Sequence, residues 1–187
     1  MHNGKIGIII DPGSDKEKIL KECEEIDIKY ILLTHCHYDH IESVNEIKKI
    51  KNSKVISSEN CKNNMNDSVI NGSFLFGCSV SFEPSDEIIY DNQILKTEVG
   101  EIKCISTPGH TDCSVCFIIE NHVFSGDTLF KLSIGRCDLK TGNIIEIEKS
   151  IKERLYLLDE DFIVHPGHGS DTTIGYEKKH NLYFKAE

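Results

Sequence analysis

Short apolar runs, separated by polar turns, divide the first third of the chain into alternating strands and helices. Residues 6–10 and 30–34 are apolar runs too short for helices and are typical of buried strands. Between them, Ser14 with Glu17 predicts a capping box that opens a helix running to about Glu25. Apolar residues at helical spacing over 41–47 predict a second helix. This region therefore reads as a βα unit followed by a strand and a helix.

The remaining two thirds predict paired strands followed by a helix. Residues 54–58 form another short strand, and 88–105 and 117–125 read as hairpins. Residues 144–158 have the apolar periodicity of an amphipathic helix. Residues 60–73, polar with five asparagines, predict a mobile surface segment. Paired strands between helices favour an α+β fold of sheets covered by helices.

A dense cluster of metal-liking side chains follows the second strand. Three histidines and one aspartate, His35, His37, Asp39 and His40, occupy six positions. Imidazole and carboxylate bind Zn, Fe or Mn, and this set exceeds what one tetrahedral ion takes from adjacent residues. Two neighbouring ions are therefore predicted. The alternative is a polar helix cap with chance histidines, but three histidines in six residues are hard to explain in that way.

Three further candidate ligands lie directly after predicted strands. His110 follows a Pro-Gly turn, Asp127 follows Ser125-Gly126, and His168 follows Pro166-Gly167. Loops held at strand ends are where catalytic groups concentrate. A single Pro-Gly-His is usually only a structural turn, yet two ions that share a water need about seven or eight protein groups. Together with the first cluster, these residues predict a dinuclear site.

Five motifs, in this order, resemble the loop motifs of the metallo-β-lactamase-fold superfamily: Asp11, the 35–40 cluster, His110, Asp127 and His168. The resemblance spans nearly the whole chain. It implies one hydrolase domain over residues 1–187 with the αββα sandwich of that family. Ten residues precede Asp11, where the family usually has an additional strand, so the N-terminal strand region is expected to be shortened.

Residues 125–138 and 166–177 resemble the single-domain glyoxalase II branch of this superfamily. The resemblance implies a hydroxyacylglutathione hydrolase, which cleaves S-lactoylglutathione or a similar 2-hydroxyacyl thioester with metal-bound hydroxide. The small-molecule thioester is thus the expected partner. The 19 residues after His168 (187 minus 168) are too few for the helical C-terminal domain that grips glutathione in two-domain relatives. Other residues must then bind the thiol carrier, or the chain does not recognise it.

The same resemblance assigns the ligands by position. It implies that one ion is held by His35, His37 and His110, the second by Asp39, His40 and His168, and that Asp127 bridges both. Asp39 would also act in catalysis by orienting the hydroxide. The expected cofactors are two divalent transition-metal ions, with zinc first and iron or manganese as alternatives.

Arg136 is the candidate substrate-binding residue, because glyoxalase II relatives place a basic residue for glutathione at this point. Its planar fork suits a carboxylate. The alternative is a structural ion pair with the nearby Asp138.

Two other functions stay open from the sequence. Persulfide dioxygenases share this scaffold but use one iron held by two histidines and one aspartate. A catalytically inactive metal-binding or scaffold protein is the second alternative. Oxygen dependence and metal content separate them from the hydrolase.

Composition narrows the class of partner. The formal charge of −10 disfavours nucleic acid, whose phosphates need a basic surface. No apolar run is long enough for a membrane span or a signal segment, so we expect no membrane association and a cytoplasmic location. The eight cysteines are then expected to be thiols. The pair Cys113 and Cys116 is either a redox or zinc motif or two buried thiols, and the oligomeric state stays open.

Overall fold

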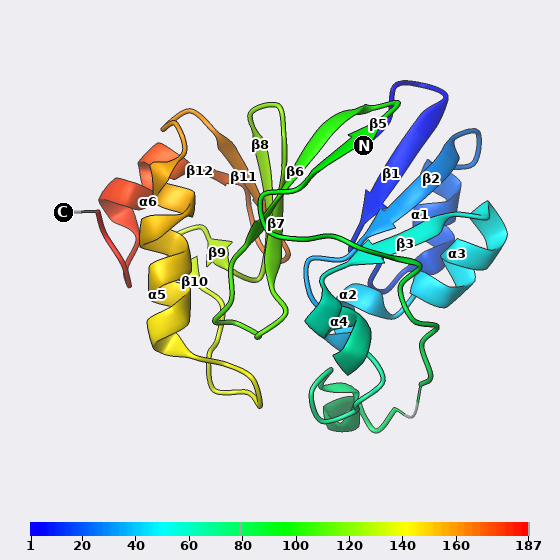
Figure 1. Ribbon diagram of the computed structural model, residues 1–187, viewed down its shortest axis with the longest axis horizontal. Helices are drawn as coiled ribbons and strands as arrows, with labels where there is room; N and C mark the ends of the chain where they lie inside the picture. Colours follow the sequence, from blue (N-terminus) through cyan, green and yellow to red (C-terminus); the bar gives the residue numbers. More distant parts are fainter. Residues whose placement is uncertain (79, 187) are drawn as a thin grey trace. The chain divides into compact units, whose positions relative to one another are not determined.

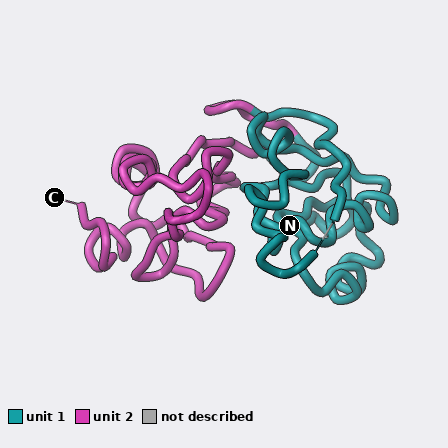
Figure 2. Tube along the Cα trace, turned by 90° about the horizontal axis from the view of Figure 1, so that it is seen from below, with its two compact units in different colours: residues 1–89, 97–100 teal, residues 90–96, 101–187 magenta. Residues whose placement is uncertain are grey.

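The computed structural model describes residues 1–78 and 80–186, and the chain forms two compact units (Figure 2). Unit 1 comprises residues 1–89 and 97–100, and unit 2 comprises residues 90–96 and 101–187. Among the described residues, no helix combines the length and the hydrophobicity needed to cross a membrane. The single hydrolase domain over 1–187 stays a prediction.

Unit 1 is built on a parallel four-stranded sheet (Figure 1). Its strands, in sheet order, are β1 (Ile6–Ile10), β2 (Asp27–Leu32), β3 (Lys54–Ser57) and β4 (Glu87–Ile88). Its helices are α1 (Lys16–Glu22), α2 (Tyr38–Ile41), α3 (Val44–Lys51), α4 (Glu59–Asn64) and the 3-10 helix η1 (Ser73–Phe76). Ile31 and Val55 are fully buried in the sheet, and Ile47 of α3 is fully buried with them. Because all four strands run the same way, the loops that follow them leave from one edge of the sheet.

Three local predictions for unit 1 are wrong. The Ser14–Glu17 capping box is absent: α1 begins at Lys16 after Asp15, whose left-handed backbone makes no side-chain cap, and it ends at Glu22. The helix predicted over 41–47 is two short helices, because the Ser43 amide and hydroxyl bind the carbonyls of Pro12 and Gly13. Residues 60–73 are not a polar surface segment throughout, since α4 starts that stretch and Asn71 is buried.

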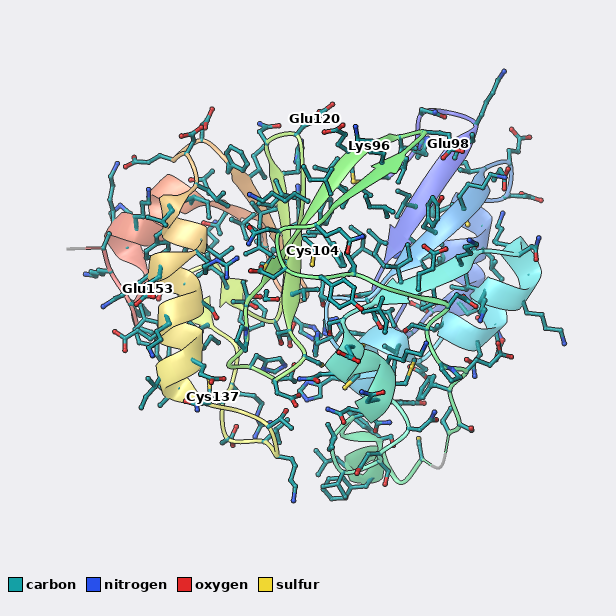
Figure 3. The ribbon with its side chains drawn as sticks, viewed as in Figure 1. Lys96, Glu98, Cys104, Glu120, Cys137 and Glu153 are labelled. Carbon is teal, nitrogen blue, oxygen red and sulfur yellow. The ribbon has the colours of Figure 1, made fainter. Side chains whose placement is uncertain are left out.

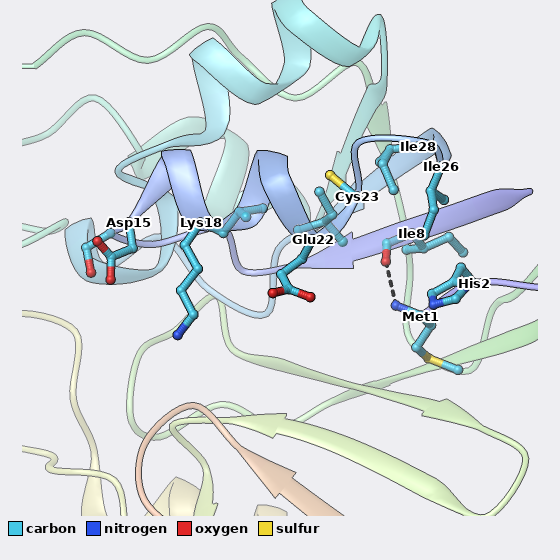
Figure 4. A pocket seen from close by; sticks show the side chains of 12 residues that line it. Met1, His2, Ile8, Asp15, Lys18, Glu22, Cys23, Ile26 and Ile28 are labelled. Carbon is cyan, nitrogen blue, oxygen red and sulfur yellow. Dashed lines mark hydrogen bonds between the residues drawn. The ribbon is translucent and has the colours of Figure 1, made fainter. Parts of the chain in front are cut away.

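The first residues fold back along β1. The Met1 amine donates to the Ile8 carbonyl at 2.9 Å, and His2 pairs antiparallel with Gly7. A cavity of about 540 Å³ lies between this turn, β1 and α1 (Figure 4). Burial lowers the pKa of the Met1 amine below its usual value.

Unit 2 contains a mixed six-stranded sheet, except for the strand-end residues Thr97 and Gly100, which belong to unit 1 (Figure 1). In sheet order its strands are β12 (Thr172–Thr173), β11 (Ile163–Pro166), β8 (His122–Gly126), β7 (Val115–Ile119), β6 (Gly100–Ser106) and β5 (Ile94–Thr97). A small antiparallel pair, β9 (Leu129–Phe130) with β10 (Ser133–Ile134), and the helices α5 (Ile144–Glu153), η2 (Leu155–Leu157) and α6 (Ile174–His180) complete it. Ile147 and Ile151 of α5 and Ile174 of α6 pack into one buried cluster with Val123 and Val164 of the sheet.

The strand predictions hold better here than the helix prediction. The β7–β8 hairpin forms as expected, with its turn at residues 120–121. The helix predicted over 144–158 ends at Glu153, because Arg154 leaves the helical conformation and a single 3-10 turn follows. Its start is well defined, since the side chain of Asn143 accepts hydrogen bonds from two backbone amides of the first turn.

Six of the eight cysteines are buried, and Cys78 and Cys137 are half-buried. No disulfide joins the cysteines of the described residues, and Cys113 and Cys116 are both buried. Cys104 lies on β6 (Figure 3), and burial raises the pKa of its thiol to about 12. A thiol with so high a pKa is protonated at neutral pH and packs as an apolar group.

Candidate metal centre

The four metal-liking side chains of the 35–40 cluster lie together in unit 1. β2 ends at Leu32, and the chain turns into α2 at Tyr38. The His35 ring centroid lies 4.8 Å from that of His37 and 4.2 Å from that of His40, and all three side chains are buried. Asp39 Oδ2 is 3.9 Å from His40 Nε2. The structure therefore brings these four side chains together within this unit, and their role as metal ligands stays a prediction.

A carboxylate at the end of β1 orients two of these histidines. Asp11 accepts hydrogen bonds from the Thr34 amide at 2.7 Å, from the Thr34 hydroxyl, and from His40 Nδ1 at 3.0 Å. The Thr34 oxygen lies 3.0 Å from His35 Nδ1. Since the hydroxyl donates its proton to Asp11, it accepts from His35. Both imidazoles thus carry a proton on Nδ1 and present Nε2 as the electron-pair donor.

Asp11 could also be counted as a ligand, because one carboxylate oxygen and nitrogens of His35 and His40 lie within 4.8 Å of one another. The hydrogen bonds of Asp11 favour a role in orienting the histidine ligands instead. A carboxylate that already accepts from an amide, a hydroxyl and an imidazole holds the ligands in place, as metal-bound histidines require. In the sequence, Asp11 is a motif without an assigned role. Its visible signal is its position directly after the first predicted strand.

The second group of predicted ligands lies together in unit 2. His110 follows β6, Asp127 follows β8 and His168 follows β11, so three loops present them. Asp127 Oδ2 lies 3.6 Å from His110 Nε2 and 3.7 Å from His168 Nε2. Two ligands that share an ion at about 2.0–2.2 Å lie at such separations. One oxygen is therefore placed almost equally between two imidazole nitrogens, which suits a carboxylate that bridges two ions.

The turn after β10 supports this second group. His110 Nδ1 donates to the Arg136 carbonyl at 2.8 Å, which again leaves Nε2 as the donor nitrogen. A Cβ added at Gly135 would lie 1.8 Å from the Asp127 carbonyl oxygen and 3.0 Å from His110 Nδ1. Only glycine lets the chain pass this close. Gly135 lies in the stretch 125–138 that resembles glyoxalase II, but the sequence alone assigns it no role; its visible signal is a glycine directly before Arg136.

Two other predicted residues have defined places. Arg136 is exposed and pairs with Asp138, which is the structural ion pair named above as the alternative to substrate binding. His165 is no ligand of this group: it bonds His122 at 2.8 Å through Nε2 and Asp171 at 3.1 Å through Nδ1. The Arg136 substrate role stays a prediction.

The donor chemistry in both units suits divalent transition metals. Five imidazoles and two carboxylates, with buried or half-buried side chains except Asp39 and His168, are borderline-to-hard ligands that suit zinc, iron or manganese. The thiol of Cys36 is buried beside the cluster, yet it belongs to none of the candidate ligand groups.

Comparisons with known proteins agree with this chemistry. The model of a family described as the metallo-beta-lactamase superfamily matches residues 2–173. Hydroxyacylglutathione hydrolase GloC of Haemophilus influenzae is 32% identical over 189 residues, which cover 98% of this chain and 89% of the relative.

Two solved structures are similar over most of both chains. The BLEG-1 B3 metallo-beta-lactamase has a TM-score of 0.91 at 34% identity, and the alignment covers 96% of this chain and 89% of the lactamase chain. TTHA1623 in a di-iron-bound form has a TM-score of 0.83 at 29% identity, with coverage of 94% and 88%. The predicted fold class is thereby confirmed. A family model that spans nearly the whole chain, together with these relatives, shows that the chain belongs to the metallo-beta-lactamase superfamily.

Proposed function

We propose that the two ligand groups act together as one dinuclear centre that hydrolyses a thioester. One ion is held by His35, His37 and His110, the second by Asp39, His40 and His168, with Asp127 between them. The observation that carries the proposal is the near-equal spacing of Asp127 Oδ2 from His110 and His168, at 3.6 and 3.7 Å. A related structure with two irons supports two ions per chain.

Bound ions at this site would supply positive charge and a nucleophile derived from water near neutral pH. The chain's own residues do the rest. Asp11 and Thr34 hold His35 and His40 in the Nε2-donor form, and the Arg136 carbonyl does the same for His110. The Asp39 side chain is 44% exposed, so its carboxylate can orient a solvent molecule as well as bind a metal. Asp39 is therefore the proposed catalytic residue.

A thioester is the proposed substrate class because its leaving group places few demands on the protein. A departing thiolate has a pKa of about 8.5 and needs little help from a proton donor. The likeness to a hydroxyacylglutathione hydrolase points in the same direction. S-lactoylglutathione, or a related 2-hydroxyacyl thioester, is the first substrate to test.

A second candidate is β-lactam hydrolysis. It is favoured by the high structural similarity to a B3 metallo-beta-lactamase, with a TM-score of 0.91 at 34% identity. Both reactions add a hydroxide to a strained or activated carbonyl. The leaving groups differ, since the amide nitrogen of a β-lactam must gain a proton whereas a thiolate need not.

The deciding experiment compares substrates on protein loaded with zinc, iron or manganese. Free thiol from S-lactoylglutathione and ring opening of a chromogenic cephalosporin are followed under argon and in air. Thioester hydrolysis at equal rates in both atmospheres, with slow cephalosporin turnover, supports the proposal. Faster cephalosporin turnover would favour the second candidate. Oxygen-dependent consumption of glutathione persulfide with release of sulfite would make the chain a dioxygenase.

A further inference from the structure

One stretch of unit 1 is unusually apolar for this chain. Charged residues make up 28% of the sequence, yet none occurs between Asp67 and Glu83. The stretch contains the sequence Ser73-Phe74-Leu75-Phe76, which forms η1. Neither the predicted ligands nor the proposed hydrolysis uses it.

Five apolar side chains of this stretch are exposed to solvent, whereas Phe82 is buried. Phe74, Leu75 and Phe76 are 52%, 58% and 63% exposed, and Val69 and Val80 of the same stretch are also exposed. We call these five residues the apolar segment. A 3-10 helix has three residues per turn, so consecutive side chains leave it in different directions. All three are more than half exposed, which means that η1 stands out from the unit. Exposed apolar groups of this density usually mark a binding site.

The apolar segment is tied to the metal-binding turn. The Tyr38 amide donates to the Asn71 carbonyl at 2.8 Å, and the Asn71 side chain donates to the Met65 carbonyl at 2.8 Å. The Tyr38 ring centroid lies 5.7 Å from that of Phe76 and 6.4 Å from that of Phe82. Tyr38 stands between His37 and Asp39 in the chain. The Tyr38–Phe76 aromatic pair is therefore attached, through Tyr38, to the turn that carries the predicted ligands His37 and Asp39.

Size and charge argue against a large partner. The five side chains expose roughly 500 Å² in all, below the ~800 Å² that each partner of a stable complex buries. The stretch carries no lysine or arginine, and the chain has a formal charge of −10. Binding to an anionic membrane normally relies on basic residues. A small apolar group matches both the area and the absence of charge.

We propose that Phe76 with Tyr38, extended by Leu75, binds the apolar acyl part of the substrate next to the metal centre. The inference rests on the proposed thioester hydrolysis and narrows its substrate class. The preferred substrates carry an alkyl acyl chain several carbons long. S-lactoylglutathione, whose acyl group is short and polar, should then be hydrolysed more slowly than a glutathione thioester with a longer alkyl acyl chain.

The test uses glutathione thioethers, which occupy the acyl position and cannot be hydrolysed. Dissociation constants of S-methyl-, S-butyl- and S-hexylglutathione are measured by calorimetry on the metal-loaded protein. Partial burial of each methylene should strengthen binding about twofold, or about thirtyfold from methyl to hexyl. Leu75→Ser and Phe76→Ser should each reduce this ratio at least about threefold. Both positions are exposed, so the variants should keep the wild-type melting temperature.

The matched control is Ile50→Ser, because Ile50 on α3 is 59% exposed and Leu75 is 58% exposed. Its chain-length ratio should equal that of the wild type. A ratio near one in the wild type, or equal ratios in all variants, overturns the inference. So does concentration-dependent dimerisation, or binding to phosphatidylcholine vesicles, that Phe76→Ser abolishes.

Turnover of the matching acyl thioesters separates this inference from the proposed function. The value of kcat/KM should rise from acetyl to hexanoyl in parallel with thioether affinity. If thioesters are hydrolysed without any chain-length preference, only the acyl assignment fails. If no thioester is hydrolysed while the thioether series keeps its preference, hydrolysis fails and the apolar binding surface stands.

Discussion

Arg136 binds Asp138 through two parallel hydrogen bonds, Nε to Oδ1 at 2.7 Å and Nη2 to Oδ2 at 2.8 Å. The hydrogen bonds from Arg136 hold the pKa of Asp138 at about 2, so the pair is ionised at neutral pH. Both side chains are exposed. A carboxylate of a thiol carrier would therefore have to displace Asp138 to reach Arg136.

Because the carrier would compete with Asp138, the predicted role of Arg136 in substrate binding can be tested by one variant that should raise KM and one that should lower it. If Arg136 binds the carrier, Arg136→Ala removes a charge-assisted hydrogen bond of about 1.5–3 kcal/mol and raises KM roughly tenfold to a hundredfold. Asp138→Asn frees the guanidinium and should lower KM, and metal content should not change in either variant. With a thioester whose carrier lacks a carboxylate, both effects should vanish. Unchanged KM in both variants would assign Arg136 to the ion pair alone.

Metal stoichiometry tests the ligand set. Elemental analysis should find two ions per chain in the wild type and fewer in His37→Ala, because a missing imidazole leaves an incomplete coordination sphere. Thioester hydrolysis should be lost in the same variant. His180→Ala is the matched control, since His180 is an exposed histidine on α6. One ion per wild-type chain at saturation would contradict the dinuclear centre.

Asp11 should act through the histidines that it orients. Asp11→Ala removes the acceptor for His40 Nδ1 and for the Thr34 hydroxyl, so zinc affinity should fall roughly tenfold to a hundredfold. Competition with a chromogenic chelator measures this change. Asp15→Asn, at an exposed position four residues away, should leave the affinity unchanged. An Asp11→Ala variant with wild-type affinity would show that the ligands are held by other contacts.

Acid should weaken unit 2 through Asp91. Burial alone would raise the pKa of Asp91, but hydrogen bonds from Arg154 at 2.7 Å and from the Ser106 amide at 2.8 Å outweigh it. The pKa of Asp91 in the folded chain therefore lies below the usual value of an aspartate. A lowered pKa stabilises the fold above the unfolded value, and this stabilisation is lost as pH falls through the folded value.

The melting temperature of the wild type should thus fall as the pH drops below about 4. Asp91→Asn should melt lower than the wild type at pH 6 and show a smaller decrease below pH 4. Asp112→Asn provides a control at another exposed acid of unit 2. Parallel pH curves for the wild type and Asp91→Asn would refute the contribution of this carboxylate.

The sequence by itself determined the elements whose signal is local. The β7–β8 hairpin and strands β1 and β3 lie where apolar runs and turn residues predicted them, because buried strands need side chains of one kind over a few adjacent positions. The seven candidate ligands could also be read directly, since each follows a strand and imidazole and carboxylate have few alternative uses at such density. Within each unit, the structure places the candidate ligands of that unit close together.

The tertiary structure decided what depends on residues far apart in the chain. Ser43 ends α2 by bonding the carbonyls of Pro12 and Gly13, a contact over about thirty residues that helical periodicity cannot register. Asp11 gained its role because β1 and β2 lie side by side and bring it against His40. Gly135 is required only because its backbone passes the Asp127 carbonyl. The exposure of Phe74, Leu75 and Phe76 was equally hidden, because apolar residues predict burial until the fold shows that nothing covers most of their surface.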